Sequence, residues 1–263
     1  MENKNKFIKV GNTVSFRPVT DGLDYTLEAN KCYTVDIDRW SDAINLTIAP
    51  DLQMPNKIYE TDDVSKFIDK VLKRYDSVEA GTVGVMLSGL KGSGKTITAK
   101  NIALKSNLPI ILIDKGFRPS LLIKLFNMLA ETEVCVLFDE IDKLSEDYDD
   151  DYLLKILDGA NTSGKKLVLC TCNDPDDISE YLKDRCSRIR YWKEFDKMNA
   201  SMIQTILEDK LNDKTEVKPL LDFISEKFDV TSFDNINSFI DEVNMYPTDS
   251  FEELFEDMNL SKK

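Results

Sequence analysis

The chain has 263 residues, 42% of them hydrophobic, which is sufficient for a large core divided among two or three structural modules. Its net charge of −14 disfavours a broad nucleic-acid-binding surface, which would require a basic footprint, although local nucleic-acid contacts within an oligomer stay open. No apolar run approaches the ~20 residues of a membrane span, and Met1–Lys6 precedes no apolar signal segment, so we expect no membrane partner and a cytoplasmic location.

Cysteine usage indicates a reducing compartment. The chain has five scattered cysteines and no histidine, and Cys170 and Cys172 share one face of a predicted strand without a second pair that would complete a metal site. We therefore expect reduced core cysteines and no zinc site.

Residues 1–54 have the pattern of β-strands. Apolar and polar residues alternate in four segments: Phe7–Val10, Thr13–Phe16, Tyr33–Ile37 and Ile44–Ile48. Turn signals such as Gly11-Asn12 separate them. The pattern predicts a small β-rich N-terminal domain, folded as an antiparallel sheet or barrel.

Residues 55–195 alternate between helix and strand. Thr61 is placed to cap a helix that runs through Tyr75, and beyond residue 78 apolar strands and helices follow one another. Such alternation predicts an α/β fold with a parallel sheet.

The segment Gly89–Thr96 matches the pattern G-x-x-x-x-G-K-[ST] in full. It follows an apolar run of strand type, Val83–Leu87, and precedes a predicted helix from Thr96 to Lys105, whose N-terminus favours phosphate. The backbone N–H groups of such a loop wrap a nucleotide phosphate, its lysine reaches the β- and γ-phosphates, and its hydroxyl binds Mg²⁺. The pattern therefore predicts a nucleotide site formed by Gly89, Gly92, Ser93, Gly94, Lys95 and Thr96, with Thr96 as a metal ligand.

Two acids follow a second apolar run, Val134–Phe138, which is typical of a strand buried on both faces. At the end of such a strand Asp139 can hold the Mg²⁺ shell, and Glu140 can polarise the attacking water. The alternative is that both are solvated loop acids. Their place at the mouth of a buried strand, downstream of the phosphate-binding loop (P-loop) Gly89–Thr96, disfavours that alternative.

Polar and basic residues follow a third predicted strand, Leu167–Cys172. Asn173 is placed to orient the water, although Asn-Asp-Pro also forms ordinary turns. Arg185 and Arg188 lie three residues apart and suit bidentate phosphate contact from a neighbouring subunit. Ion pairing with acids on the same surface is an equal alternative for both arginines.

Residues 196–263 contain helical patterns only. The predicted helices are Asn199–Leu211, Val217–Lys227, Phe233–Asn244 and Phe251–Met258. Thr215 and Thr231-Ser232 stand at the positions of N-caps.

The order of these motifs resembles the AAA+ ATPases. A P-loop, an Asp-Glu strand, a strand that ends in Asn and an R-x-x-R pair follow one another as in the AAA branch, whose Leu-Leu-Asp-Gly helix is similar to Leu153–Gly159. The segments Pro55–Tyr59, Cys172–Asp174 and Phe233–Tyr246 also resemble an AAA-family ATPase of large tailed bacteriophages. The resemblance spans about residues 55–260.

This resemblance implies a P-loop NTPase core with a parallel sheet over residues 55–195 and a C-terminal helical lid over residues 196–263, beside the β-rich residues 1–54. It implies ATP and Mg²⁺ as ligands, and Ile58 and Tyr59 are assigned to an adenine wall. The implied roles are binding of ATP and Mg²⁺ by Lys95 and Thr96, metal binding by Asp139, catalysis by Glu140, action as sensor 1 by Asn173, and action as arginine fingers on a neighbouring subunit by Arg185 and Arg188.

Two departures from the AAA pattern stand out. The R-P-G-R sequence of that branch becomes Arg185-Cys186-Ser187-Arg188, without its proline and glycine. Asp234 stands where many lid helices carry a sensor 2 arginine. Phe117 is a candidate pore aromatic by the same resemblance, but packing at a helix start is the favoured alternative.

We therefore expect an ATP-hydrolysing protein that acts as a homo-oligomeric ring or partial ring and remodels a protein or protein complex, in the host bacterial cytoplasm if phage-encoded. A clamp-loader-like ATPase of phage DNA replication is one alternative, because Arg185-Cys186 also resembles the S-R-C finger of those enzymes. A low-turnover, nucleotide-switched scaffold is the other, because sensor 2 is missing. The N-terminal domain either docks a partner or substrate or only helps to close the ring.

Overall fold

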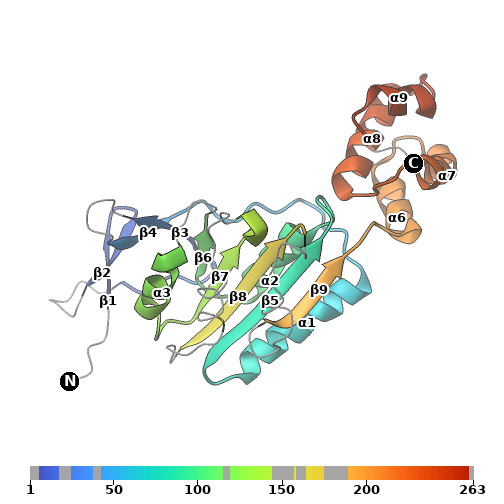
Figure 1. The fold of residues 1–263 in the computed structure, drawn as a ribbon. Helices are drawn as coiled ribbons and strands as arrows, with labels where there is room; N and C mark the ends of the chain where they lie inside the picture. The colour runs from blue at the N-terminus through green and yellow to red at the C-terminus, as the bar shows by residue number, and fades with distance from the viewer. Residues whose placement is uncertain are drawn as a thin grey trace.

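A nine-stranded sheet forms the body of the protein in this computed structural model, which describes residues 6–17, 25–37, 43–114, 119–143, 157, 164–174 and 189–260 (Figure 1). The strand order is β1-β2-β4-β3-β6-β7-β8-β5-β9. The strands are β1 (Lys6–Val10), β2 (Thr13–Arg17), β3 (Cys32–Ile37), β4 (Ile44–Ile48), β5 (Gly81–Gly89), β6 (Ile110–Ile113), β7 (Val134–Phe138), β8 (Lys165–Cys172) and β9 (Ile189–Phe195).

Helices cover both faces of the sheet and form a separate group after β9 (Figure 1). The helices are α1 (Asp62–Ser77), α2 (Lys95–Lys105), α3 (Pro119–Met128), α6 (Ala200–Lys210), α7 (Val217–Lys227), α8 (Phe233–Met245) and α9 (Phe251–Asp257). Short 3-10 turns cover Ile141–Lys143 and Lys214–Glu216. In the part of the chain that the structure describes, no helix has the length and apolar content needed to cross a membrane.

The central strands are parallel, as the alternation of strand and helix predicts. β6 pairs with β7, β7 with β8, β8 with β5, and β5 with β9, all in parallel register. The α/β fold class with a parallel sheet is therefore confirmed. Parallel pairing requires a crossover between successive strands, and helices such as α2 supply it and cover the sheet faces.

The four N-terminal strands differ from the expectation of a sheet or barrel of their own. They pair antiparallel with one another, as their alternation predicts, but β3 also pairs in parallel with β6 through Cys32–Ile110, Tyr33–Ile111 and Thr34–Leu112. One sheet therefore runs from β1 to β9. The apolar edge of β6 gains a hydrogen-bonded neighbour in this way, which an open edge would lack. The domain boundaries at residues 54 and 195 stay predictions.

Two apolar layers hold the helices on the sheet. Val83, Val85 and Leu87 of β5 face the buried residues of α1 and α2, whereas Met86 faces the opposite layer, which includes α3. Both strand faces are thus covered, and this accounts for the nearly continuous apolar runs in the sequence. The cysteines within the described residues, Cys32, Cys135, Cys170 and Cys172, are buried and form no disulfide bond, as predicted for core thiols.

The C-terminal helices α6–α9 have a core of their own. The rings of Phe239 and Phe255 pack against each other and against those of Phe223 and Phe228, with centroids 4.9–6.2 Å apart. The predicted helices agree with the observed ones to within one residue at each end, and Ser232 caps α8 by accepting from the N–H of Asn235. The cap expected at Thr215 is wrong, because Thr215 lies inside a 3-10 turn capped by Asp213.

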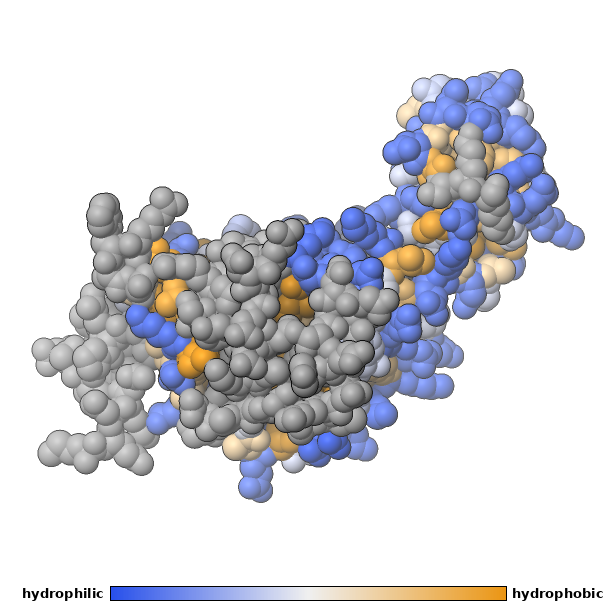
Figure 2. All heavy atoms as spheres, in the orientation of Figure 1, coloured by the Kyte–Doolittle hydropathy of each residue, from blue (hydrophilic) through white to orange (hydrophobic). Residues whose placement is uncertain are grey.

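We call residues 196–260 the lid. It stands beyond the end of β9, and Figure 2 shows its visible surface as mostly hydrophilic, with hydrophobic atoms where it joins the sheet domain. Most apolar side chains of the lid lie in its own core, whereas Met245 and Tyr246 are exposed.

Candidate active site

Three predicted motifs meet at the carboxyl ends of neighbouring parallel strands. The register pairs Ser88 of β5 with Cys172 of β8, and Phe138 of β7 with Cys170 of β8. The segments that leave these strands are the P-loop, Asp139-Glu140 and Asn173, so they lie side by side at one edge of the sheet. In open α/β sheets this is the edge at which ligands bind.

The P-loop backbone forms a cradle that suits phosphate. Gly92 and Gly94 have φ values of 69° and 99°, which glycine adopts at no steric cost. Gly94 is also the N-cap of α2 and makes no side-chain cap hydrogen bond, so the first N–H groups of the helix are available to an anion. The hydroxyl of Ser93 is buried and finds no partner among the described residues, as expected of a group that serves a ligand.

Lys95 lies inside this loop. Its side chain is 5% exposed, and its Nζ donates to the carbonyl oxygens of Gly89 and Leu90, both at 2.7 Å. Burial lowers the pKa of Lys95, while the charges of Asp139, Glu140 and nearby groups oppose that shift. The two carbonyls hold the ammonium at the base of the loop, close to where the pattern places phosphate.

A chain of hydrogen bonds joins the P-loop helix to Asp139. The hydroxyl of Thr96 donates to Asp139 Oδ1 at 2.9 Å, and the hydroxyl of Thr171 donates to the same oxygen at 2.7 Å. A hydroxyl and a carboxylate are oxygen ligands of the kind that Mg²⁺ prefers. Thr96 and Asp139 therefore fit the metal that the P-loop pattern predicts, and they come together from different elements.

Glu140 sits in a constrained position. Its φ is 56°, the left-handed region that a non-glycine residue rarely adopts, at a cost of about 1–2 kcal/mol. Its N–H donates to Thr171 Oγ1 at 2.8 Å, which helps to hold that backbone. Its carboxylate accepts from Asn173 Nδ2 at 3.0 Å and from Lys143 Nζ at 2.7 Å. The predicted catalytic acid and the predicted sensor are thus in direct contact.

Thr171 is a site residue that sequence reasoning missed. It is fully buried and positions both acids, because its hydroxyl donates to Asp139 and accepts from the Glu140 N–H. The available signal was a hydroxyl residue within the otherwise nearly apolar run Leu167–Cys172. Only the β7–β8 register shows that this residue lies next to Asp139.

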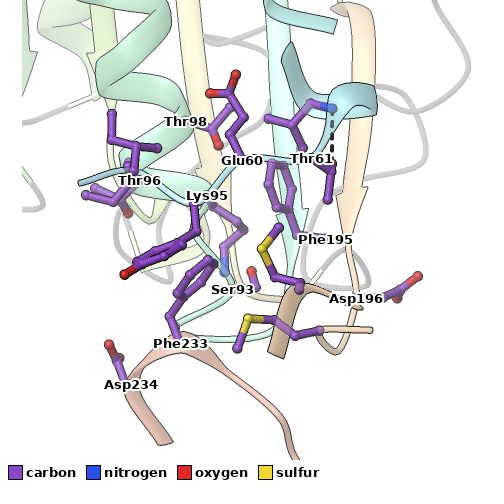
Figure 3. A pocket seen from close by; sticks show the side chains of 18 of the residues that line it. Glu60, Thr61, Ser93, Lys95, Thr96, Thr98, Phe195, Asp196, Phe233 and Asp234 are labelled. Atoms are coloured by element: carbon purple, nitrogen blue, oxygen red, sulfur yellow. Dashed lines mark hydrogen bonds between the residues drawn. The ribbon is translucent and has the colours of Figure 1, made fainter. Parts of the chain in front are cut away.

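Several of these groups, among them Lys95, Thr96 and Thr171, line a cavity of about 1080 Å³ between the sheet domain and the lid (Figure 3). The P-loop, Glu140 and Asn173 line one side, and Phe233 and Asp234 of α8 line another. Figure 3 shows Phe233 beside Lys95 and Ser93. The lid thus takes part in the site.

Ile58 and Tyr59, assigned to an adenine wall, also line the cavity. The Tyr59 ring lies 6.2 Å from the Phe233 ring between centroids, at an interplanar angle of 32°. The Tyr59 hydroxyl bonds to Asp209 of α6, and burial together with that bond raises the pKa of Tyr59 to about 12. Phe233 and Asp209 were not expected from the sequence, because both lie far from Tyr59 along the chain. Base binding by this wall stays a prediction.

Several predicted residues lie outside the described part of the chain. They are the two proposed fingers, Arg185 and Arg188, the candidate pore residue Phe117, and most of the Leu153–Gly159 segment. Their roles stay predictions.

Comparison with known proteins supports the interpretation of this site. No curated protein matches the chain. Residues 85–194 match the model of the family described as "ATPase family associated with various cellular activities (AAA)". This span begins within β5 and ends within β9, and it includes the P-loop, both acids and Asn173. The sheet order and the meeting of these motifs at one edge agree with that match over residues 85–194.

Proposed function

We propose that this protein binds ATP with Mg²⁺ and hydrolyses it. The observation that carries the proposal is the hydrogen-bonded set Thr96–Asp139–Thr171 and Asn173–Glu140 at the P-loop of the segment that matches the AAA family model. A binding loop alone would explain nucleotide affinity. A carboxylate held beside a polar amide at the same edge adds the group that hydrolysis requires.

Each residue of the site has a distinct task in this proposal. Lys95 and the N-terminus of α2 bind the phosphates and neutralise their charge. Thr96 and Asp139 hold Mg²⁺, which when bound draws charge from the phosphates. Glu140 accepts a hydrogen bond from the attacking water and polarises it, and Asn173 fixes the direction of that carboxylate. Both carboxylate oxygens of Glu140 have further lone pairs for the water.

Thr171 should affect turnover through the two acids that it positions. Thr171→Val keeps the shape of the side chain but removes the donor to Asp139 and the acceptor for the Glu140 N–H. We expect kcat for ATP hydrolysis to fall about tenfold or more, and the free energy of unfolding to fall by about 1–3 kcal/mol. Steady-state phosphate release and urea unfolding measure the two effects.

Thr171→Ser is the matched control, because it retains the hydroxyl. Its kcat should return to within about threefold of the natural protein. A valine variant with undiminished kcat would show that the Thr171 hydroxyl does not position the catalytic groups.

We further propose that the protein works as a homo-oligomeric ring or partial ring that remodels a protein or protein complex. AAA family members commonly oligomerise, and this supports the proposal. Arg185 and Arg188 would then act on the site of an adjacent subunit. The net charge of −14 favours a protein partner over nucleic acid.

Mixing two inactive variants tests whether the arginines act in trans. Lys95→Ala removes the subunit's own site but keeps its arginines, and Arg185→Ala keeps the site but removes one finger. Each protein alone should be inactive, and an equimolar mixture should recover ATPase activity, because some interfaces pair an intact site with an intact finger. A mixture that assembles by light scattering yet stays inactive contradicts finger action in trans.

Arg190 supplies the control for this mixing experiment. It is exposed on β9, five residues beyond Arg185, and its replacement by alanine removes the same charge. Arg190→Ala alone should keep the ATPase activity of the natural protein.

Stimulation of the ATPase activity of the natural protein by an unfolded protein, rather than by primed DNA, would support remodelling over a clamp-loader-like role.

A further inference from the structure

The lid contacts the P-loop directly at Gly92. The N–H of Phe233, the first residue of α8, donates to the carbonyl oxygen of Gly92 at 2.8 Å. A Cβ added to Gly92 would lie 2.8 Å from Asp234 Oδ2 and 3.2 Å from Ser232 Cβ. A Cβ added to Gly94 would lie 3.5 Å from Phe233 Cε2. The beginning of α8 therefore packs on the two glycines that shape the phosphate cradle.

The contact carries a negative charge. Asp234 is exposed at the cavity that Lys95 and Thr96 also line, and Figure 3 shows it at the start of α8. Within the described ranges no lysine or arginine forms an ion pair with this carboxylate. Asp234 belongs to the first turn of α8, and its position over Gly92 places a carboxylate without an ion-pair partner among the described residues next to the loop that we propose binds nucleotide phosphate.

We propose that Asp234 makes the lid contact sensitive to the γ-phosphate, so that ATP weakens the Phe233–Gly92 hydrogen bond more than ADP does. This inference rests on the proposed function. A triphosphate brings one more negative charge to the cradle than a diphosphate, and repulsion of a carboxylate over Gly92 rises with that charge. The free energy needed to move the lid reduces the net free energy of ATP binding. Asp234 therefore also lowers the affinity for ATP relative to ADP.

A cation at this position would have the opposite effect, because it would draw the lid toward the γ-phosphate. The sign of the charge at residue 234 thus determines whether the triphosphate closes or releases the contact. The structural consequence is a lid that rests on the loop when the γ-phosphate is absent and leaves it when the γ-phosphate is present.

The test compares nucleotide affinities of the natural protein, Asp234→Asn and Asp241→Asn by calorimetry with Mg²⁺. The probes are ADP and the non-hydrolysable triphosphate AMP-PNP. Asp241 is also exposed on α8 but does not line the cavity, so its replacement is the matched control. We expect Asp234→Asn to tighten AMP-PNP binding about three- to tenfold and ADP binding clearly less, with both gains shrinking as salt is raised. Asp241→Asn should change neither affinity.

Hydrogen exchange at the Phe233 amide provides a readout that affinity alone does not. In the natural protein AMP-PNP should speed this exchange relative to ADP, and in Asp234→Asn the two nucleotides should give equal rates. If the natural protein binds neither nucleotide, the proposed function fails and this inference fails with it. If it binds both, and Asp234→Asn alters neither the affinity ratio nor the exchange difference, only the inference is overturned.

Discussion

Replacing Lys95 by alanine should weaken ATP binding at least about a hundredfold. The side chain is buried in the P-loop, where it is held by the carbonyls of Gly89 and Leu90, and its ammonium is the cation best placed to meet phosphate oxygens. Charge-assisted hydrogen bonds contribute about 1.5–3 kcal/mol each, and loss of one or two accounts for this factor. Calorimetry with ATP and Mg²⁺ measures the change directly.

Lys105→Ala provides the control for this substitution. Lys105 is exposed at the far end of the same helix, so its loss removes one positive charge and leaves the loop unchanged. The Lys105→Ala variant should bind ATP with the same affinity as the natural protein. Equal ATP affinities for Lys95→Ala and the natural protein would place the phosphate site elsewhere.

Glu140→Gln should bind ATP with nearly natural affinity but hydrolyse it about a thousandfold more slowly. The amide keeps an oxygen that can accept from Asn173, yet it lacks the charge that polarises water, a contribution of typically 10²–10⁴ in rate. Asp139 and Thr96 stay in place for Mg²⁺, so the assembled, ATP-bound form should persist. Single-turnover hydrolysis and size analysis in ATP measure the two effects.

Glu133→Gln is a suitable comparison, because Glu133 precedes β7 at the strand end opposite to Glu140. Its carboxylate pairs with Lys165 at 3.7 Å, and Lys165 belongs to the beginning of β8. Turnover of Glu133→Gln should stay within about twofold of the natural protein. A Glu140→Gln variant that hydrolyses ATP within a few-fold of the natural rate would remove Glu140 from the role of catalytic acid.

Local patterns predicted most of the elements correctly because each has a local cause. The apolar run Val134–Phe138 is a strand with those same ends, since burial on both faces leaves no room for polar residues. The lid helix Val217–Lys227 also has the predicted ends, because its apolar period begins and stops there. The P-loop match was long enough to specify both a loop geometry and the helix that follows it.

Features that depend on which segments pair could not be predicted in the same way. The joining of β3 to β6 depends on contacts between residues almost 80 positions apart, and no periodicity encodes such a partner. The sequence predicts only that Thr171 belongs to a strand. Its place beside Asp139 follows from the β7–β8 register. The position of Asp234 over Gly92 likewise depends on how the lid meets the loop, although the sequence did show an acid where an arginine was expected.

Phosphate release by the natural protein, measured with ATP and Mg²⁺ over a range of protein concentrations, tests the central proposal most directly. We predict Mg²⁺-dependent hydrolysis whose rate per subunit rises with concentration, in parallel with assembly followed by light scattering. In this proposal hydrolysis needs Glu140 from one subunit and an arginine from the next. A protein that binds ATP and assembles yet releases no phosphate above background at any concentration would contradict it and would favour a nucleotide-switched scaffold.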